Sequence, residues 1–178
     1  KNGDLRTAAL ERGLHSLVGF DGPIMTDSGT FQAHVYGKIE LEPLEIVEFQ
    51  KAIGSDIGTV LDIFSEPDDG REKAESDLAE TIRRTGISAE NKGSMMLAGP
   101  IQGGRFPDLR EWAAKEMSKL GCDVFPIGGV VPMMERQMYF TLADSVLSAK
   151  ACLDPSKPVH LFGAGHPMVF SLAALMGC

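Results

Sequence analysis

The sequence contains few cysteines and no long apolar run, and each shortage excludes a class of protein. Its 178 residues include three cysteines, Cys122, Cys152 and Cys178, none of them in a Cys-x-x-Cys pair. This spacing excludes a disulfide framework and a zinc knuckle, and reduced thiols in a cytoplasmic protein are the expected state. No apolar run approaches the roughly 18 residues that a membrane span needs, so we expect no membrane contact.

Positive charge and the common motifs of nucleotide and metal binding are lacking as well. Lys and Arg number 17 against 25 Asp and Glu, a formal net charge of -8. This balance does not suggest a nucleic-acid partner, because phosphate binding favours a basic surface, but a basic patch can lie on another domain. No Gly-x-x-x-x-Gly-Lys-Ser/Thr segment is present, which excludes a P-loop. The four histidines have no spacing typical of a metal site, and we expect no metal ligands in this chain.

The first residues contain neither an initiator Met nor the apolar region of a signal peptide. We therefore expect the chain to begin inside something longer, or to have been processed. Hydrophobic residues make up 43% and charged residues 24% of the chain, values typical of one ordinary globular core.

What the sequence does contain is a repeated unit of short apolar strand, glycine-rich turn and helix, at a spacing of about 30 residues. The predicted strands cover 24–26, 56–64, 94–101, 124–127 and 159–162. The predicted helices cover 4–18, 43–53, 71–85, 106–120, 132–153 and 167–176, and a hairpin-like excursion covers 31–41. This alternation predicts an α/β fold, a (β/α)8 TIM barrel. A whole barrel needs eight units and about 250 residues, so residues 1–178 would hold about five to six of its units.

Polar residues stand near the carboxyl ends of these strands, where α/β proteins place their chemistry. Asp27 follows the first strand within Asp-Ser-Gly, which also commonly caps a turn. Asp62 lies in an apolar strand, and a buried carboxylate is costly unless it accepts hydrogen bonds, from the backbone or from a ligand. Gln102 offers a donor and an acceptor, so Asp62 and Gln102 together suit a purine-like base. Gly128-Gly129 would expose backbone amides to a planar ligand, or form a tight turn.

Four motifs carry a family resemblance over nearly the whole chain. They are Thr-Asp-Ser-Gly-Thr-Phe-Gln at 26–32, Pro-Ile-Gln-Gly-Gly at 100–104, Pro-Ile-Gly-Gly-Val-Val-Pro at 126–132 and His-Leu-Phe-Gly-Ala-Gly-His-Pro at 160–167. Their order and spacing resemble those of the tRNA-guanine transglycosylases, and the last two motifs look like the archaeal branch. The fold of that family is a TIM barrel, in agreement with the prediction from the repeated unit.

The resemblance implies a transferase that exchanges guanine in the dihydrouridine arm of tRNA for 7-cyano-7-deazaguanine (preQ0) in archaeosine biosynthesis. The reaction it implies is a double displacement through a covalent carboxylate–ribose intermediate. Expected partners are tRNA, the guanine or preQ0 base and, for the full-length protein, a second copy in a homodimer. The family's second essential Asp, its zinc ligands and its C-terminal tRNA-binding domains are expected beyond Cys178. By itself the chain is therefore not expected to catalyse the exchange.

The resemblance also assigns roles to residues of this chain. Asp27 matches a catalytic carboxylate, either the nucleophile or its acid–base partner. Asp62, Gln102 and the Gly129 amide match the groups that recognise the base, and Phe31 matches an aromatic stacked on it. The full set of substrate-binding residues implied is Asp62, Gln102, Gly128, Gly129, Phe31, Ser28, Val130, Val131 and Phe162.

Three other functions are compatible with parts of this pattern. A non-catalytic transglycosylase-like subunit would bind tRNA, although such a subunit has no need of Asp27, Asp62 and Gln102 together. A paralogue resembling archaeosine synthase would act on the base after its insertion. An unrelated TIM-barrel enzyme with an acidic site is the alternative if only the barrel is considered.

Overall fold

The computed structural model, which describes residues 2–32 and 41–178, is organised around five short parallel strands. They are β1 Met25–Thr26, β2 Ile57–Thr59, β3 Met96–Ala98, β4 Phe125–Ile127 and β5 Val159–Leu161. β1, β2 and β3 form one parallel sheet in that order, and β4 pairs with β5 in a second. A parallel bridge between Ala98 and Val124 joins the two, so neighbours in space follow chain order.

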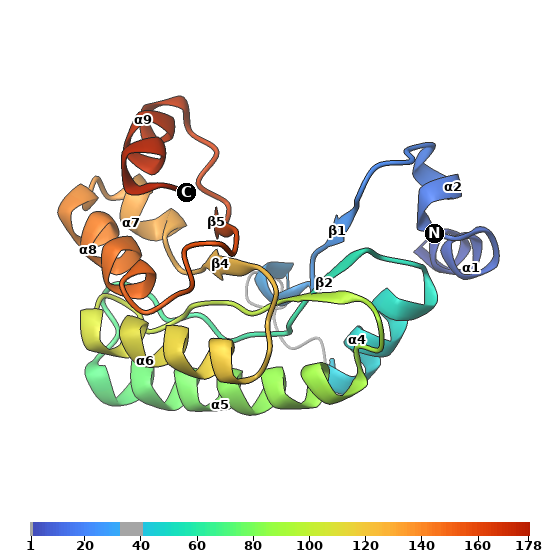
Figure 1. The fold of residues 1–178 in the computed structure, drawn as a ribbon, viewed down its shortest axis with the longest axis horizontal. Helices are drawn as coiled ribbons and strands as arrows, with labels where there is room; N and C mark the ends of the chain where they lie inside the picture. The colour runs from blue at the N-terminus through green and yellow to red at the C-terminus, as the bar shows by residue number, and fades with distance from the viewer. Residues whose placement is uncertain (1, 33–40) are drawn as a thin grey trace.

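Helices precede, connect and follow the strands. They are α1 Asn2–Arg12, α2 Leu14–Val18, α4 Pro43–Ala52, α5 Arg71–Asn91, α6 Pro107–Lys119, α7 Val131–Glu135, α8 Tyr139–Lys150 and α9 Pro167–Met176. Figure 1 shows α4, α5 and α6 below the strands, with α8 packed against α6 and α9 above α8. Parallel strands need such crossover helices, so the expected α/β fold is confirmed, while closure into a barrel stays a prediction.

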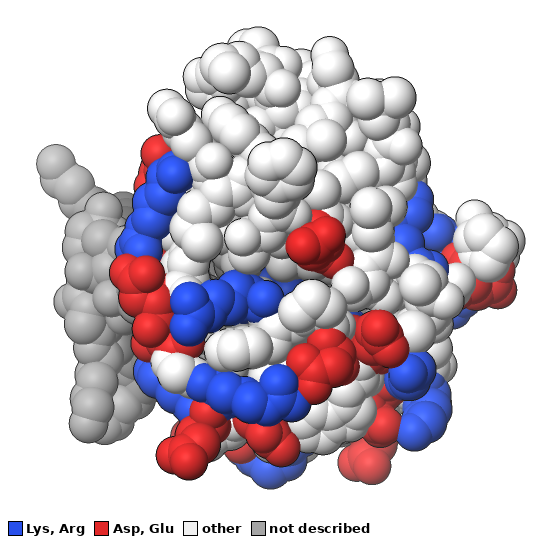
Figure 2. All heavy atoms as spheres, turned by 90° about the vertical axis from the view of Figure 1, so that its left-hand side faces the viewer, with Lys and Arg blue, Asp and Glu red and all other residues white. Residues whose placement is uncertain are grey.

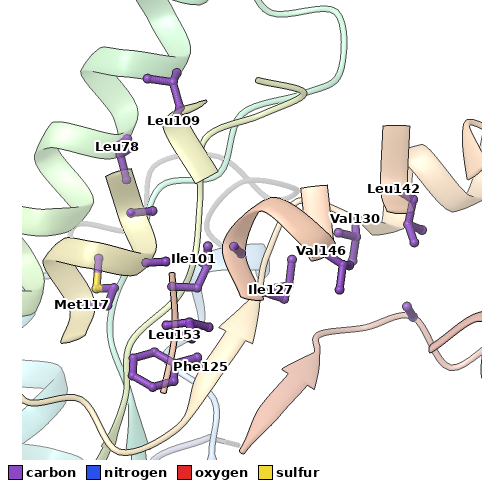
Figure 3. Packing of buried hydrophobic residues seen from close by; sticks show 14 of the residues in the cluster. Leu78, Ile101, Leu109, Met117, Phe125, Ile127, Val130, Leu142, Val146 and Leu153 are labelled. Atoms are coloured by element: carbon purple, nitrogen blue, oxygen red, sulfur yellow. The ribbon is translucent and has the colours of Figure 1, made fainter. Parts of the chain in front are cut away.

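The hydrophobic core lies between β3, β4 and the helices α5, α6 and α8. Leu97 and Ile127 are fully buried from the strands, as is Met117 from α6. Leu142 and Val146 complete the cluster from α8 (Figure 3). This packing holds the ends of β3 and β4, and the loops that follow them, in fixed positions.

Several predicted boundaries were wrong, for local reasons. The helix predicted over 4–18 is two helices, because Gly13 has a φ of 77° and breaks the helical path. The helix predicted over 132–153 is also two, separated near Gln137, whose φ is 58°. The strand predicted over 56–64 pairs only at Ile57–Thr59, and α5 continues to Asn91. Most of the predicted hairpin over 31–41 lies outside the described residues.

The surface formed by α8 and α9 is strongly apolar. Large side chains are exposed here: Phe140, Leu147, Met168, Phe170 and Leu175. Figure 2 faces this side, and its upper part over α8 and α9 carries few charged groups, whereas both signs of charge cover the part below. An apolar area of this kind usually marks a surface that another part of a protein covers. Within the part of the chain described, no helix has the length and apolar character to cross a membrane.

Candidate active site

A cavity of about 640 Å³ opens at the carboxyl ends of the five strands. Its volume lies in the range of small-molecule sites, roughly 300 to 1,000 Å³. The predicted site residues that line it are Asp27, Ser28, Phe31, Asp62, Gln102, Gly128, Gly129, Val131 and Phe162. Segments far apart in sequence therefore meet at one edge of the sheet, as the strand-end positions predict.

Asp62 and Gln102 form the polar centre of the cavity. The Gln102 Nε2 donates a hydrogen bond to the Asp62 Oδ2 at 2.5 Å, although 40 residues separate them. Gln102 is almost fully buried, and its Oε1 has no hydrogen-bond partner among the described residues. Thr30 contributes a bond from its Oγ1 to the backbone carbonyl of Asp62 at 3.2 Å. The pair contains both hydrogen-bond acceptors and donors, and its role in binding a heterocycle stays a prediction.

Burial raises the pKa of Asp62 above its ordinary value of 3.8. The hydrogen bonds from Gln102 and Thr30 oppose this rise, and the charge of Asp27 adds to it. The charge of Asp27 therefore acts on Asp62 across the cavity, as one carboxylate does on another in a shared site.

Asp27 is exposed to the cavity, and its loop is held from behind. The Asp27 Oδ1 accepts a bond from the Gly29 N–H at 3.3 Å, which is the turn-capping contact that Asp-Ser-Gly suggested. Capping therefore does not exclude a role in the site. The buried Gln50 of α4 donates through Nε2 to the carbonyls of Thr26 at 3.4 Å, Asp27 at 3.3 Å and Thr59 at 3.2 Å. Sequence reasoning missed Gln50, whose only signal is a polar side chain within the apolar stripe of its helix.

Gly128 and Gly129 form a close-fitting wall against Gln102. A Cβ added to Gly128 would lie 2.1 Å from the Gln102 Nε2. Gly129 has a φ of 68°, a conformation that favours glycine, and a Cβ there would lie 3.3 Å from the Gln102 Oε1. The position of the Gln102 amide therefore favours glycine at 128, and the backbone conformation favours it at 129. The turn is present, but the Gly128 N–H donates to the Ile101 carbonyl at 3.1 Å and is not available to a planar ligand; the role of the Gly129 N–H stays a prediction.

Three of the four apolar residues that the resemblance assigns to the pocket border the cavity, and Val130 does not. Phe31, with 57% of its surface exposed, and the half-buried Phe162 both border the cavity. Val131 borders it as well, but Val130 is fully buried in the hydrophobic core with Val146 (Figure 3). The resemblance assigned both valines to the pocket, but α7 begins at Val131 and the two side chains have different surroundings.

Charged residues that sequence reasoning did not single out also reach the cavity. Glu66, Glu135 and Arg136 border it. Arg136 pairs with Asp68 at 2.5 Å and with Glu66 at 3.6 Å, which links the segment after β2 to the end of α7. Across residues 2–32 and 41–178, no group of three or more His, Cys, Asp or Glu side chains is arranged to hold a metal ion. The zinc site that the resemblance implies stays a prediction about residues outside this chain.

Comparison with known proteins adds an independent line of evidence. The family described as queuine tRNA-ribosyltransferase matches residues 2–178. Relatives named tRNA-guanine(15) transglycosylase include one from Methanocaldococcus jannaschii, 51% identical over 182 residues, with 100% of this chain and 28% of the relative covered. Others from Methanosarcina acetivorans and Haloarcula marismortui are 52% identical, with 98% of this chain and 36% of each relative covered. The chain spans about a third of the length of these relatives. It belongs to the queuine tRNA-ribosyltransferase family.

Proposed function

We propose that the protein containing this chain is a glycosyltransferase that exchanges guanine in tRNA for another purine-like base. One observation carries the proposal: the cavity brings together Asp27, the Asp62–Gln102 pair and Gly129. A carboxylate, an amide and a backbone N–H match the hydrogen-bonding edge of guanine, and Phe31 offers a face for stacking. The names of the relatives, tRNA-guanine(15) transglycosylase, support the same reaction.

The incoming base in this proposal is preQ0, inserted into the dihydrouridine arm during archaeosine biosynthesis. PreQ0 keeps the pyrimidine edge of guanine, so the same carboxylate and amide can bind both bases. The target nucleotide must leave its stack to enter a cavity of about 640 Å³, which is large enough for a base.

The chemistry proposed is a double displacement at C1′ of the ribose. A carboxylate attacks C1′, the bond from C1′ to N9 of guanine breaks, and guanine leaves with a proton on N9. PreQ0 then loses its N9 proton and attacks C1′, which releases the carboxylate. Asp27 serves either as the nucleophile or as the group that moves these protons, and a second carboxylate outside this chain takes the other role.

The same proposal extends to the architecture. We infer that further βα units close the five strands into a TIM barrel and cover the apolar surface of α8 and α9. The relatives are about three times as long as this chain, which leaves room for these units, a zinc site and tRNA-binding domains. A homodimer of the full-length protein and a location in the cytoplasm belong to the same proposal.

Incorporation of radiolabelled guanine into tRNA transcripts by the full-length protein tests the function. The wild type should incorporate label, and unlabelled preQ0 should then displace it. Asp27→Asn should lose at least about a hundredfold in rate, as expected when a covalent or acid–base group is removed. Glu75→Gln, on the exposed surface of α5 and outside the cavity, is the control and should keep full activity. Binding of tRNA with no exchange would favour the non-catalytic subunit, and activity only on tRNA that already contains preQ0 would favour the archaeosine synthase-like enzyme.

A further inference from the structure

Arg110 is a buried cation that no carboxylate within the described residues neutralises. Its side chain projects from α6 and is completely shielded from solvent. Burial lowers its pKa to about 10, so the guanidinium stays charged at neutral pH. Burying a charge without an opposite charge is costly, and hydrogen bonds must offset the lost hydration.

The hydrogen bonds of Arg110 go to two loops that line the cavity. Its Nε donates to the Gly104 carbonyl at 2.9 Å, and its Nη1 donates to the carbonyls of Ile101 at 2.6 Å and Gly128 at 2.8 Å. Ile101 and Gly104 flank Gln102-Gly103, whereas Gly128 belongs to the loop after β4. One rigid, planar guanidinium therefore braces the loop that carries Gln102 against the loop that carries Gly129, beside the backbone bond from the Gly128 N–H to the Ile101 carbonyl at 3.1 Å.

Direct contacts connect Arg110 to Asp62 and Gln102, the polar centre of the cavity. Gly128, held by Arg110, leaves just enough space for the Gln102 amide, which in turn donates to Asp62. The Arg110 Nη2 is buried, has no hydrogen-bond partner in the described part of the chain, and lies 3.6 Å from where a Cβ of Gly129 would stand. A charged group thus lies directly behind the wall that the base would contact.

We propose that Arg110 is a positioning residue for base recognition, which holds Gln102 and the Gly129 amide at the spacing that a planar guanine-like base requires. This inference rests on the function proposed above. A purely structural role, in which Arg110 only completes the core, makes a different prediction: stability would change while base affinity would not.

The test compares Arg110→Lys and Arg110→Met with Met117→Ala in the full-length protein. Met117 is equally buried on the same helix and its sulfur lies close to Gly99, but its side chain has no N–H or O–H to donate to the carbonyls of the two loops. Lysine keeps the charge but lacks the planar guanidinium group, and methionine keeps much of the side-chain volume but has no hydrogen-bond donors. Equilibrium dialysis with radiolabelled guanine measures affinity, hydrogen exchange measures protection of residues 101–104 and 128–130, and thermal unfolding measures stability.

Both Arg110 variants should weaken guanine binding at least about tenfold. Backbone hydrogen exchange in both loops should become faster by a similar factor, as expected when hydrogen bonds from a charged donor are lost. Met117→Ala should lower the melting temperature while guanine affinity and loop exchange stay near those of the wild type. Unchanged guanine affinity in a folded Arg110 variant would overturn the inference, as would unchanged loop exchange in both variants. A wild type that binds no guanine would instead overturn the proposed function, and loop exchange would still decide whether Arg110 orders the two loops.

Discussion

Replacing Gly128 with alanine tests the fit between the two loops most directly. Gly128 lies outside the positive-φ region, so alanine can adopt its backbone conformation. The only change is the added methyl group, which would stand 2.1 Å from the Gln102 Nε2 and 2.8 Å from its Cδ. Contacts this short do not persist, so the Gln102 amide or the loop must move.

The expected change in the free energy of unfolding depends on whether the Gln102 amide or the loop moves. If the Gln102 amide moves, its bond to the Asp62 carboxylate is lost, and a hydrogen bond to a charged group contributes about 1.5 to 3 kcal/mol. If the loop moves instead, an extra methyl group in a well-packed site costs about 1 to 3 kcal/mol. Either route lowers the free energy of unfolding by about 1 to 3 kcal/mol. The same loss in binding corresponds to about a fivefold to 150-fold weaker affinity for guanine.

Denaturant unfolding and guanine dialysis on the full-length protein measure the two effects. Gly165→Ala is the matched control, because a Cβ there meets no heavy atom of the described residues within 4 Å and its φ is not positive. The control should change neither quantity by more than about 0.5 kcal/mol, as for an ordinary surface substitution. A Gly128→Ala protein that matches Gly165→Ala in both assays would refute the idea that this glycine sets the position of Gln102.

Two further predictions concern the carboxylates. Gln50→Leu removes the donor that holds the carbonyls of Thr26, Asp27 and Thr59. We expect the free energy of unfolding to fall by about 1 to 3 kcal/mol and the rate of guanine exchange into tRNA to fall as well. An unchanged rate of guanine exchange would contradict this role of Gln50. Guanine affinity should fall as the pH drops through the pKa of Asp62, which burial holds above 3.8, because the protonated carboxyl is a poorer acceptor. Asp62→Asn should bind weakly at every pH, and a wild-type affinity independent of pH would refute the role of Asp62.

Much of the fold follows from local patterns in the sequence. Short apolar runs that end in glycine-rich turns predicted the five parallel strands, and the helix over 167–176 was predicted at its observed bounds. Errors arose where one residue changes the backbone direction, as at Gly13 and Gln137. A helical apolar pattern continues through such residues, so the pattern cannot show the break.

The sequence by itself determined the class of fold and most residues of the candidate site. Asp27, Asp62 and Gln102 could be identified because polar residues after buried strands meet at one edge of a parallel sheet. The tertiary structure alone decided which groups touch: the bond between Asp62 and Gln102, and the support of the site from behind by Gln50 and Arg110. These contacts join residues on separate strands and helices, and their geometry depends on how the elements pack, which no local spacing encodes.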